Sequence, residues 1–389
     1  MSQSPLDQKA LEQELSGQQP SLSQINVFPV KSVGGIALSS AWVEKQGLTF
    51  DRRFMLALAD GSMITARKYP KMVKVSSSLQ PDGLIFTYEG KEPLRLKYAN
   101  FKMQEAPATV WKDSFTAYTT NDEADDWFSD VLGVRVELLF SGEQSNRVRE
   151  KLGQNVSFAD GYPMLVISQA SLDELNRRSP EVHSMDQFRT NFVVSNTEAF
   201  AEDGWKRIRI GEVEFEAVKP CERCILTTVD VERGEFRATK EPLNTFSTFR
   251  ANERGGVFFG QNLVAKNEGL VKAGDVVEVL ETKEKEHYED TWAFGVAQAT
   301  EEAVKQLQLS VNGYLFEGNN QSTLLEQAES AGVSIASSCR AGFCGACKVT
   351  LESGQVHQPD VPALQEHERN MGQILACCSV PQTDIEVVD

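Results

Sequence analysis

Four cysteines near the end of the chain have the residue type and spacing of an iron–sulfur ligand set. Cys339, Cys344 and Cys347 form the pattern C-x4-C-x2-C, and Cys377 follows after 29 intervening residues. A [2Fe–2S] cluster needs four soft thiolates, and three clustered cysteines plus a distant one are typical of plant-type ferredoxins. The pattern predicts a cluster that transfers one electron at a time, and Cys378, beside Cys377, is the competing fourth ligand.

Two other interpretations of these cysteines are less well supported. Structural zinc sites usually show two C-x2-C pairs, and only one such pair occurs here. A disulfide framework needs an oxidising compartment, whereas residues 1–20 have neither the basic nor the apolar region of a signal peptide. Near the cysteines, the capping box Thr323-x-x-Glu326 predicts a helix that ends near Gly332, and residues 346–351 are expected to form a strand.

A second pair, Cys221 and Cys224, lies in the segment KPCERCILTTVD and leaves three interpretations open. A zinc knuckle would need a second pair of ligands. A thioredoxin-like C-x-x-C would sit at a strand-to-helix turn, whereas the β-branched run over residues 225–229 predicts a strand. The third interpretation is a single reactive thiolate, which the cations Lys219 and Arg223 would favour. A soft thiolate of this kind suits a transition metal such as molybdenum.

The composition argues against several classes of function. The net charge of −17 argues against a nucleic-acid partner, and no apolar run approaches the ~18 residues needed to span a membrane. Neither G-x-G-x-x-G nor G-x4-G-K-[ST] occurs, so no dinucleotide site or P-loop is predicted. Five of the seven cysteines lie in the last 51 residues, which favours a reducing cytoplasm. Residues 301–389 hold 12 acidic and 4 basic side chains, a net charge of −8 that favours a positively charged redox partner.

Around these residues the sequence predicts many short strands and few helices, as in a barrel or sandwich. Strands are expected over residues 25–30, 53–59, 72–77, 84–88, 192–195, 207–218, 275–280 and 307–316. Pro81-Asp82-Gly83 predicts a hairpin turn. A helix is expected from the N-cap Asn121 to Gly133, and a second one over residues 170–178. The charge-dense segment 281–302 is predicted to be an interdomain linker.

Several motifs, taken together, resemble those of one known family. They are FPVKSVGG at 28–35, SFADGYP at 157–163, FRTNFVVS at 188–195 and KPCERCILTTVD at 219–230. They resemble the MOSC superfamily of molybdenum-cofactor proteins, and within it the bacterial YcbX-type proteins and the mitochondrial amidoxime reducing component. The resemblance implies a mainly β protein with α+β character. Its expected parts are a flexible polar tail (1–21), an N-terminal MOSC β-barrel domain (22–145), a MOSC β-barrel domain (146–280), the linker (281–302) and a β-grasp ferredoxin domain (303–389).

The resemblance also implies a set of site residues. Cys224 matches the molybdenum ligand of the family, with Arg223 beside the metal as a second catalytic candidate and Cys221 as a non-ligating neighbour. The implied cofactor-binding residues are Lys31, Ser32, Arg53, Asp160, Gly161, Tyr162, Arg189, Asn191, Arg223 and Asn262. Mitochondrial members carry Thr and Ser where Gly161 and Tyr162 stand, and Tyr where Asn262 stands. Arginine forks and a lysine point charge suit the dianionic phosphate of molybdopterin.

From the resemblance we expect a reductase of N-hydroxylated compounds, namely hydroxylamines, N-hydroxylated bases and amidoximes. The molybdenum cofactor would be re-reduced one electron at a time by the [2Fe–2S] cluster, and the cluster by an external flavoprotein reductase. The residues themselves leave two alternatives open. These are a flavin-dependent reductase fused to a ferredoxin, and a non-enzymatic carrier of electrons or sulfur.

Overall fold

The computed structural model describes residues 19–252, 256–290, 305–320, 322–337, 342, 345–358, 361 and 363–388. The chain is mainly β, as the sequence predicts, and forms two compact units. The first unit contains residues up to 221, 226–242 and 259–286, and the second contains 222–225, 243–258 and the residues from 287 onward. Within the described residues, no helix combines the length and the apolar character that a membrane crossing requires.

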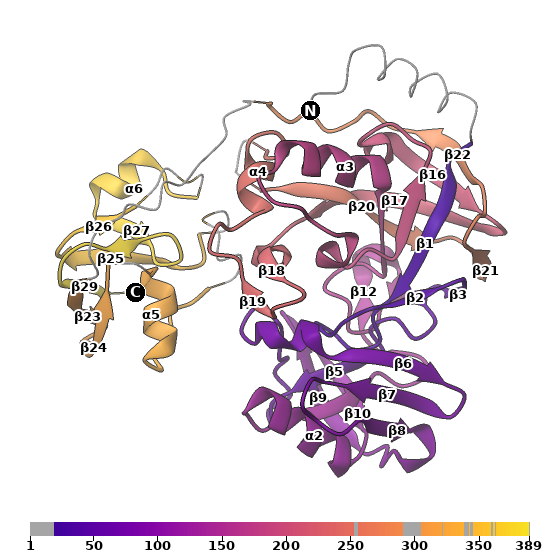
Figure 1. Ribbon diagram of the computed structural model, residues 1–389, viewed down its shortest axis with the longest axis horizontal. Coiled ribbons are helices and arrows are strands. Elements are labelled where there is room, and N and C mark those ends of the chain that lie inside the picture. Colours follow the sequence, from indigo (N-terminus) through magenta and orange to yellow (C-terminus); the bar gives the residue numbers. More distant parts are fainter. Residues whose placement is uncertain are drawn as a thin grey trace. The chain divides into compact units, whose positions relative to one another are not determined.

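An eight-stranded sheet forms the larger part of the first unit (Figure 1). In spatial order its strands are β2 (Ile36–Leu38), β1 (Ser21–Val27), β15 (Phe192–Ser195), β14 (Met164–Ser168), β20 (Phe258–Ala265), β17 (Val213–Glu222), β16 (Trp205–Ile210) and β22 (Val277–Thr282). A three-stranded sheet of β21 (Gly269–Lys272), β3 (Ser40–Glu44) and β4 (Gly47–Leu48) lines the same core. Large buried side chains such as Phe192, Trp205 and Phe215 fill the space that these strands enclose.

The centre of this sheet contains one parallel connection. β14 and β15 are parallel neighbours, and the chain between them forms α3 (Gln169–Arg178), which packs on both strands. Ser168, the last residue of β14, caps this helix because its side chain accepts a hydrogen bond from the Ser171 amide. β14 is buried along its whole length, as expected for a strand covered on both faces. The helix predicted over 170–178 and the strand predicted over 192–195 are confirmed.

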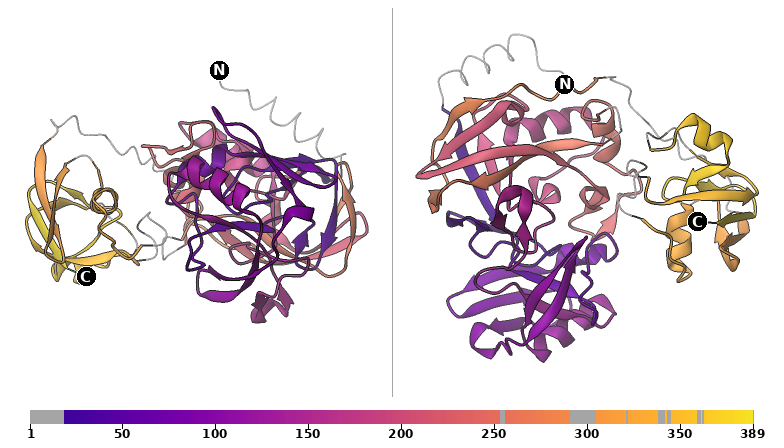
Figure 2. Two further views of the ribbon diagram at one scale, coloured as in Figure 1. Left: turned by 90° about the horizontal axis from the view of Figure 1, so that it is seen from below. Right: turned by 180° about the vertical axis from the view of Figure 1, so that it is seen from behind.

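A second core of the first unit lies between two smaller sheets. One has the order β5 (Phe54–Ala57), β11 (Glu137–Phe140), β10 (Asp113–Thr119), β9 (Glu105–Val110), and the other is β6 (Ser76–Gln80), β7 (Gly83–Thr87), β8 (Leu94–Lys97). Seen from below, these N-terminal strands curve around their core (Figure 2). Alternate residues of β5 face opposite sides: Phe54 points into this core, and Met55 into a separate cluster with Phe158. Phe158 thereby anchors the loop before β14 to the small sheet.

The predicted helix between Asn121 and Gly133 is confirmed as α2 (Asp122–Leu132). The Asn121 side chain accepts a hydrogen bond from the Ala124 amide at 2.9 Å, and Gly133 ends the helix in the left-handed conformation with φ 72°. The apolar face of α2 packs against Phe86 through Phe128. Local capping chemistry and the apolar period agree here, so the sequence alone specifies this helix.

Four strand predictions need correction. Residues 72–77 begin in a 3-10 helix, η1 (Pro70–Lys74), because Pro70 at its first turn presets the helical φ. Residues 225–228 also form a 3-10 helix, η6, before the short strand β18 (Val229–Asp230), which pairs with β19 (Glu235–Phe236). The strands predicted over 207–218 and 307–316 are each a hairpin, with turns at Gly211 and at Asn312-Gly313. The hairpin at Pro81-Asp82 is confirmed by the pairing of Gln80 with Gly83.

Sheet membership does not follow the predicted domain order. β1 and β2 fall within the predicted first domain, yet they pair with β15 in the large sheet that contains strands of the predicted second domain. The predicted linker begins inside β22 and then remains attached to the first unit. The Lys283 amide donates to the carbonyl of Gly204, and its ammonium donates to Gln261 Oε1 at 3.0 Å. Residues 291–302 of the predicted linker lie outside the described residues.

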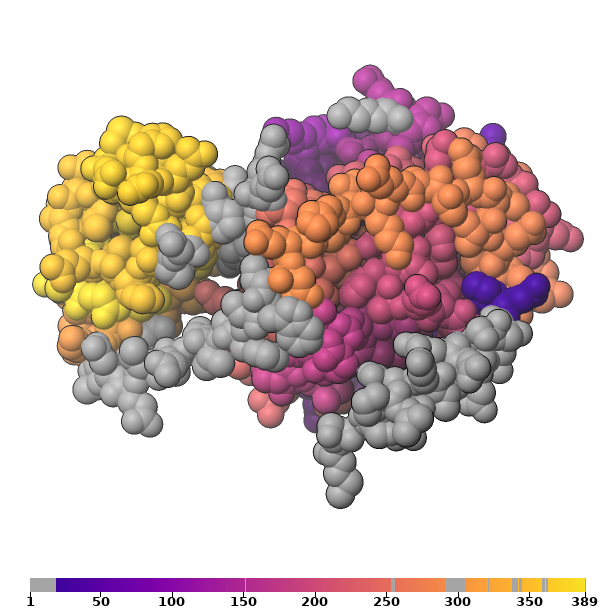
Figure 3. Space-filling view, turned by 90° about the horizontal axis from the view of Figure 1, so that it is seen from above, coloured from indigo at the N-terminus to yellow at the C-terminus, as the bar shows by residue number. Residues whose placement is uncertain are grey.

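The C-terminal part of the second unit has its own sheet, with the order β24-β23-β29-β25-β27. These strands are β24 (Tyr314–Asn319), β23 (Gln306–Val311), β29 (Ile385–Val388), β25 (Lys348–Ser353) and β27 (Gln373–Leu375), and two helices accompany them, α5 (Leu324–Ser330) and α6 (Glu366–Asn370). The predicted capping box is confirmed, since Thr323 and Glu326 exchange side-chain to backbone hydrogen bonds. Figure 3 shows these residues, in orange to yellow, packed as one body. They enclose an apolar core of their own.

Replacing Asn121 with alanine should lower the free energy of unfolding of the first unit by about 1 kcal/mol, because α2 loses its N-cap acceptor. The measurement is urea denaturation followed by circular dichroism. Asn121→Asp keeps an acceptor at the same position and should retain most of the stability. If Asn121→Asp loses as much stability as Asn121→Ala, the loss does not come from the cap acceptor.

Candidate functional site

A buried lysine and a loop aspartate form the centre of the predicted cofactor site. Lys31 follows β1, and Asp160 lies in the loop that precedes β14. The Lys31 ammonium donates to Asp160 Oδ1 at 2.5 Å and to the carbonyl of Phe158 at 2.9 Å. Two further donors reach the same carboxylate, Arg67 Nη2 at 3.2 Å and Trp111 Nε1 at 3.1 Å. The structure thus brings Lys31 and Asp160 together, as the resemblance implies.

The two charges of this pair lie in different environments. Lys31 is 5% exposed, whereas the Asp160 side chain is 50% exposed, so water still reaches the carboxylate. Burial lowers the pKa of Lys31 to about 8, although Asp160 opposes the shift. Desolvation acts to raise the pKa of Asp160, but the cations of Lys31 and Arg67 outweigh it and hold that pKa well below its usual range. The carboxylate is therefore ionised at neutral pH, and the buried ammonium depends on it.

Arg147 holds the loop that carries Asp160. Its guanidinium, only 1% exposed, donates to the carbonyls of Ser157, Ala159 and Asp160. It also pairs with Asp113, the first residue of β10, at 2.8 Å. A buried guanidinium is tolerated when its donors are satisfied and its charge is paired. Arg147 therefore fixes the backbone of residues 157–160 against the small sheet.

Arg189 and Arg52 lie together beside Phe28. Their guanidinium carbons are 4.3 Å and 4.5 Å from the centroid of the Phe28 ring. Both residues have a left-handed backbone, with φ of 54° and 48°, a conformation that costs energy for a side chain of this size. Arg189 donates to the carbonyl of Val33 at 2.5 Å, and Arg52 donates to the carbonyl of Arg189 at 3.0 Å. Burial and the charge of Arg52 lower the pKa of Arg189, but an arginine keeps its charge at physiological pH.

Asn191 positions this arginine pair from the protein interior. Its Oδ1 accepts from Arg52 at 3.0 Å and from the Leu165 amide at 3.2 Å, and its Nδ2 donates to the carbonyl of Asn26 at 3.0 Å. The side chain is fully buried. In the structure Asn191 supports Arg52, so the contact to a cofactor edge that the resemblance implies stays a prediction.

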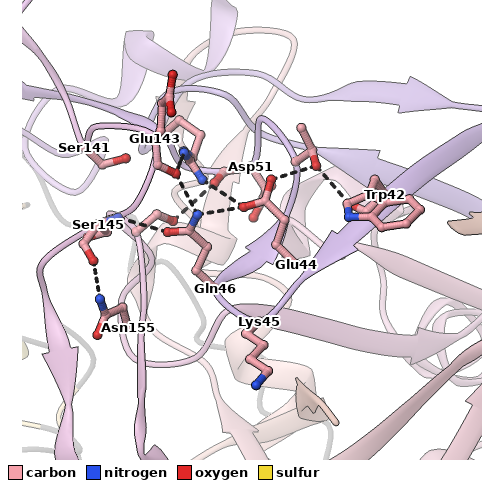
Figure 4. A network of polar contacts seen from close by, with 12 residues as sticks. Trp42, Glu44, Lys45, Gln46, Asp51, Ser141, Glu143, Ser145 and Asn155 are labelled. Atoms are coloured by element: carbon pink, nitrogen blue, oxygen red, sulfur yellow. Dashed lines mark hydrogen bonds and ion pairs between the residues drawn. The ribbon is translucent and has the colours of Figure 1, made fainter. Parts of the chain in front are cut away.

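Arg53 contacts a different set of groups, and its expected contact with a cofactor stays a prediction. Its guanidinium donates to Glu44 Oε2 at 3.3 Å and to the carbonyls of Gly142 and Glu143. Figure 4 shows Glu44 and Glu143 of this network. Gln46 belongs to the same network, because its amide donates to Glu44 and to the Glu143 carbonyl. Arg52 lies in a turn with a left-handed backbone and Arg53 follows it directly before β5, so the two neighbouring arginines point to different partners.

The remaining predicted residues surround the loops of the site. Ser32 follows Lys31 with a left-handed φ of 68°. A Cβ on Gly161 would meet only Arg149 Nη2, at 3.7 Å, so this backbone faces a cation in open space. The Tyr162 ring lies 5.6 Å from the Lys219 ammonium. Asn262 donates to the carbonyls of Lys219 and Pro220, and thereby ties β20 to the backbone that leads into Cys221.

Cys221 and Cys224 are both partly exposed. Arg223 between them is buried, and its amide donates to the carbonyl of Val257 at 2.8 Å. Cys224 belongs to the compact unit that contains residues 243–258, whereas the cations described above belong to the first unit. Because η6 begins directly after Cys224, the chain turns away at this thiol rather than continuing as a strand. The role of Cys224 as a metal ligand stays a prediction.

Two of the four predicted cluster cysteines lie within the described residues. Cys347 and Cys377 are buried with their thiols in hydrogen-bonding contact, and the Gly342 amide donates to Cys377. Cys378 Sγ lies 3.6 Å from Cys377 Sγ and packs against Gly342, where a Cβ would come within 2.9 Å of it. A thiol that faces Cys347 and receives a backbone N–H has the surroundings of a cluster ligand. These contacts support Cys377 over Cys378, and Cys339 and Cys344 lie outside the described residues.

Sequence reasoning missed three cations and a tryptophan of this site: Arg52, Arg67, Arg147 and Trp111. The doubled arginine after Asp51 carried a signal for Arg52, but choosing between the two arginines needs the local geometry. The sequence carried no signal for Arg67 or Trp111, because the two residues lie in separate connections and come together only in the folded chain, at Asp160. The cations outnumber the nearby carboxylates, an excess of positive charge that suits a phosphate-bearing ligand.

Three parts of the chain match known domain families in the order that the sequence predicts. Residues 19–135 match the MOSC N-terminal beta barrel domain, residues 153–278 the MOSC domain, and residues 309–382 the 2Fe-2S iron-sulfur cluster binding domain. The chain is 31% identical over 280 residues to mitochondrial amidoxime reducing component 2 of Rattus norvegicus, covering 66% of this chain and 82% of that relative. It is 30% identical over 285 residues to mitochondrial amidoxime-reducing component 1 of Homo sapiens, covering 67% and 82%.

Arg147→Gln should lower the free energy of unfolding by about 3 kcal/mol, because Asp113 and three loop carbonyls lose a buried partner. Arg149→Gln is the matched control. Arg149 pairs with the same carboxylate but is one-third exposed, so its loss should cost about 1 kcal/mol or less. Both values can be measured by urea denaturation. Equal losses from the two variants would contradict the positioning role of Arg147.

Proposed function

Because the chain belongs to the MOSC-domain family that includes the mitochondrial amidoxime-reducing components, we propose that it is a molybdenum-cofactor-dependent reductase of N-hydroxylated compounds. The substrate class comprises hydroxylamines, N-hydroxylated bases and amidoximes. In the net reaction the N–O bond breaks, two electrons and two protons are taken up, and water leaves. The hydroxyl oxygen of the substrate thereby ends in water, and the nitrogen is reduced while it keeps its bond to carbon.

One observation carries this proposal. Relatives named for amidoxime reduction match two-thirds of the chain, and residues 309–382 match an iron–sulfur domain that can deliver electrons. The cation cluster around Lys31 adds independent support from geometry. A cluster of buried, hydrogen-bonded cations is costly to fold unless it binds something of opposite charge.

The residues suit a molybdopterin group in charge and in ligand chemistry. When bound, such a cofactor supplies a metal that can exchange an oxygen atom and two electrons with a substrate. Cys224 would hold the metal through its thiolate, since soft sulfur ligands suit transition metals. Lys31, Arg67 and Arg189 would bind and orient the anionic end, and Asn191 would act through Arg52 as a positioning residue.

The iron–sulfur domain would supply electrons singly. Cys339, Cys344, Cys347 and Cys377 would hold the [2Fe–2S] cluster, and the net charge of −8 over residues 301–389 suits a positively charged surface on a donor. We infer an external flavoprotein reductase as that donor, because the sequence contains no dinucleotide-binding motif. Five of the seven cysteines lie in the last 51 residues, where thiolates would bind iron, which favours a reducing compartment such as the cytoplasm.

Cys224→Ala should abolish reduction of benzamidoxime and remove molybdenum from the purified protein, while the iron content and visible absorbance of the cluster stay unchanged. Cys221→Ala is the matched control, three positions away and also partly exposed, and should retain most of the activity and metal. Molybdenum and iron per polypeptide are measured by plasma mass spectrometry. Equal losses from both variants would instead indicate a dithiol mechanism, and iron without molybdenum in the parent protein would indicate a carrier.

The purified chain should not reduce N-hydroxylated substrate with NADPH alone, because its sequence contains no dinucleotide-binding motif. Adding a flavoprotein reductase should start turnover, and the rate should fall as salt screens the acidic surface. Turnover with dithionite, which needs no protein partner, should depend much less on salt and serves as the control. Turnover with NADPH in the absence of a reductase would refute the external donor.

A further inference from the structure

The contacts of Asp160 are unusual for a half-exposed carboxylate. Its two oxygens accept from three donors that come from three separate segments: the Lys31 ammonium, the Arg67 guanidinium and the Trp111 indole. Its backbone carbonyl is held by Arg147, which is buried. Asp160 is therefore held in position through both its side chain and its backbone. Surface carboxylates normally keep one flexible ion pair of little energetic value, so this arrangement needs another explanation.

Trp111 shows that the arrangement is costly to maintain. It occupies the two-residue turn between β9 and β10 with a φ of 58°, where Gly, Asn or Asp is normally preferred. Its indole remains 42% exposed, so burial does not repay this strain. The ring instead contacts Arg67, whose guanidinium carbon lies 4.6 Å from the ring centroid, and donates to Asp160. Strained residues of this kind concentrate at ligand sites.

We propose that Asp160 is a positioning residue, which holds the Lys31 ammonium and the Arg67 guanidinium side by side so that both serve one tetrahedral dianion of a ligand. The inference deepens the proposed function, because the dianion would be the phosphate end of the molybdenum cofactor. Asp160 itself does not touch that anion. It acts through the two cations.

The donor inventory of Lys31 supports this role. An ammonium has three N–H donors, and among the described residues two of them are used, by the Phe158 carbonyl and by Asp160. The third remains for a ligand. The charged groups that face Lys31 are Asp160, Arg67 and Arg147, so Asp160 is the one anion that offsets two neighbouring cations. Removing its charge leaves a buried ammonium beside two guanidinium groups.

The opposite role is also testable. A carboxylate near an anion site could repel the ligand, in which case its removal would strengthen binding at every pH. The positioning role predicts a different result, because the ammonium binds the anion only while it is protonated. With Asp160 present, Lys31 has a pKa of about 8, and without it burial and the two guanidinium groups act unopposed. Binding that needs the protonated ammonium is lost as the pH rises through the pKa of Lys31. Without the charge of Asp160, this loss should occur at a lower pH than in the parent protein.

The test uses sulfate, which stays a dianion from about pH 6 to about pH 9, so that only the protein titrates. Sulfate is titrated calorimetrically into the full chain purified from a host that makes no molybdenum cofactor. For the parent protein, affinity should fall above about pH 8. For Asp160→Asn the fall should move down by about one pH unit or more, giving about tenfold weaker binding at pH 8. Asp160→Glu keeps the charge and should retain the parent profile.

Two further variants separate positioning from a merely structural effect. Asp122→Asn removes a carboxylate that pairs with Lys102 elsewhere in the first unit and should change nothing. Lys31→Arg combined with Asp160→Asn should restore binding that is independent of pH in this range, since arginine needs no partner to stay charged. Circular dichroism confirms that each variant is folded.

An Asp160→Asn variant with the parent pH profile, or with tighter binding at pH 8, would overturn the proposal. If Asp160→Asn does not fold, a pH midpoint in Asp160→Glu that differs from the parent by more than about one unit would overturn it equally. The outcome is independent of catalysis. A protein that binds sulfate as expected but reduces no N-hydroxylated substrate would refute the proposed function and leave this inference intact.

Discussion

The ion pair between Lys31 and Asp160 is the constraint on which the rest of the site depends. It joins residues 129 positions apart, and it places a buried ammonium next to the loop that precedes β14. A buried charge is tolerated only when it is paired and hydrogen-bonded. The surrounding structure meets this requirement with the Phe158 carbonyl, which accepts from Lys31, and with Arg147, which holds the loop backbone.

The fold supplies this constraint through its unusual sheet membership. β1 leaves the N-terminal part of the chain to pair with β15, and the chain then returns through Lys31 to the small sheet at β5. Lys31 follows β1, and Asp160 precedes β14. Both residues therefore extend from the same sheet, in which only β15 separates the two strands. Phe158 packs against β5 residues in a separate apolar cluster and anchors the same loop to the small sheet. The large sheet and the small sheet thus both hold the partners of the ion pair.

The iron–sulfur domain is built from its own elements and does not share the two sheets described above. Its sheet, helix cap and apolar core are its own, and the thiols of Cys347 and Cys377 meet inside that core. A module of this kind can be added to a chain without rebuilding the partner domains, because electron transfer needs proximity and not a shared core. The relatives named for amidoxime reduction match the chain over two-thirds of its length, and this chain has a 2Fe-2S domain of its own at residues 309–382.

The sequence by itself determined the features that depend on local chemistry. The caps of α2 and α5, the hairpin at Pro81-Asp82 and the spacing of the cluster cysteines are set by residues a few positions apart. The domain order and the importance of Lys31, Asp160 and Arg189 came from motifs.

Only the tertiary structure decided which of Arg52 and Arg53 faces Arg189, and that Arg67, Arg147 and Trp111 meet at Asp160. Those contacts depend on the register and pairing of strands that are distant along the chain. Arg52 and Arg53 are neighbours in a turn, and no local pattern in the sequence distinguishes the one that meets Arg189.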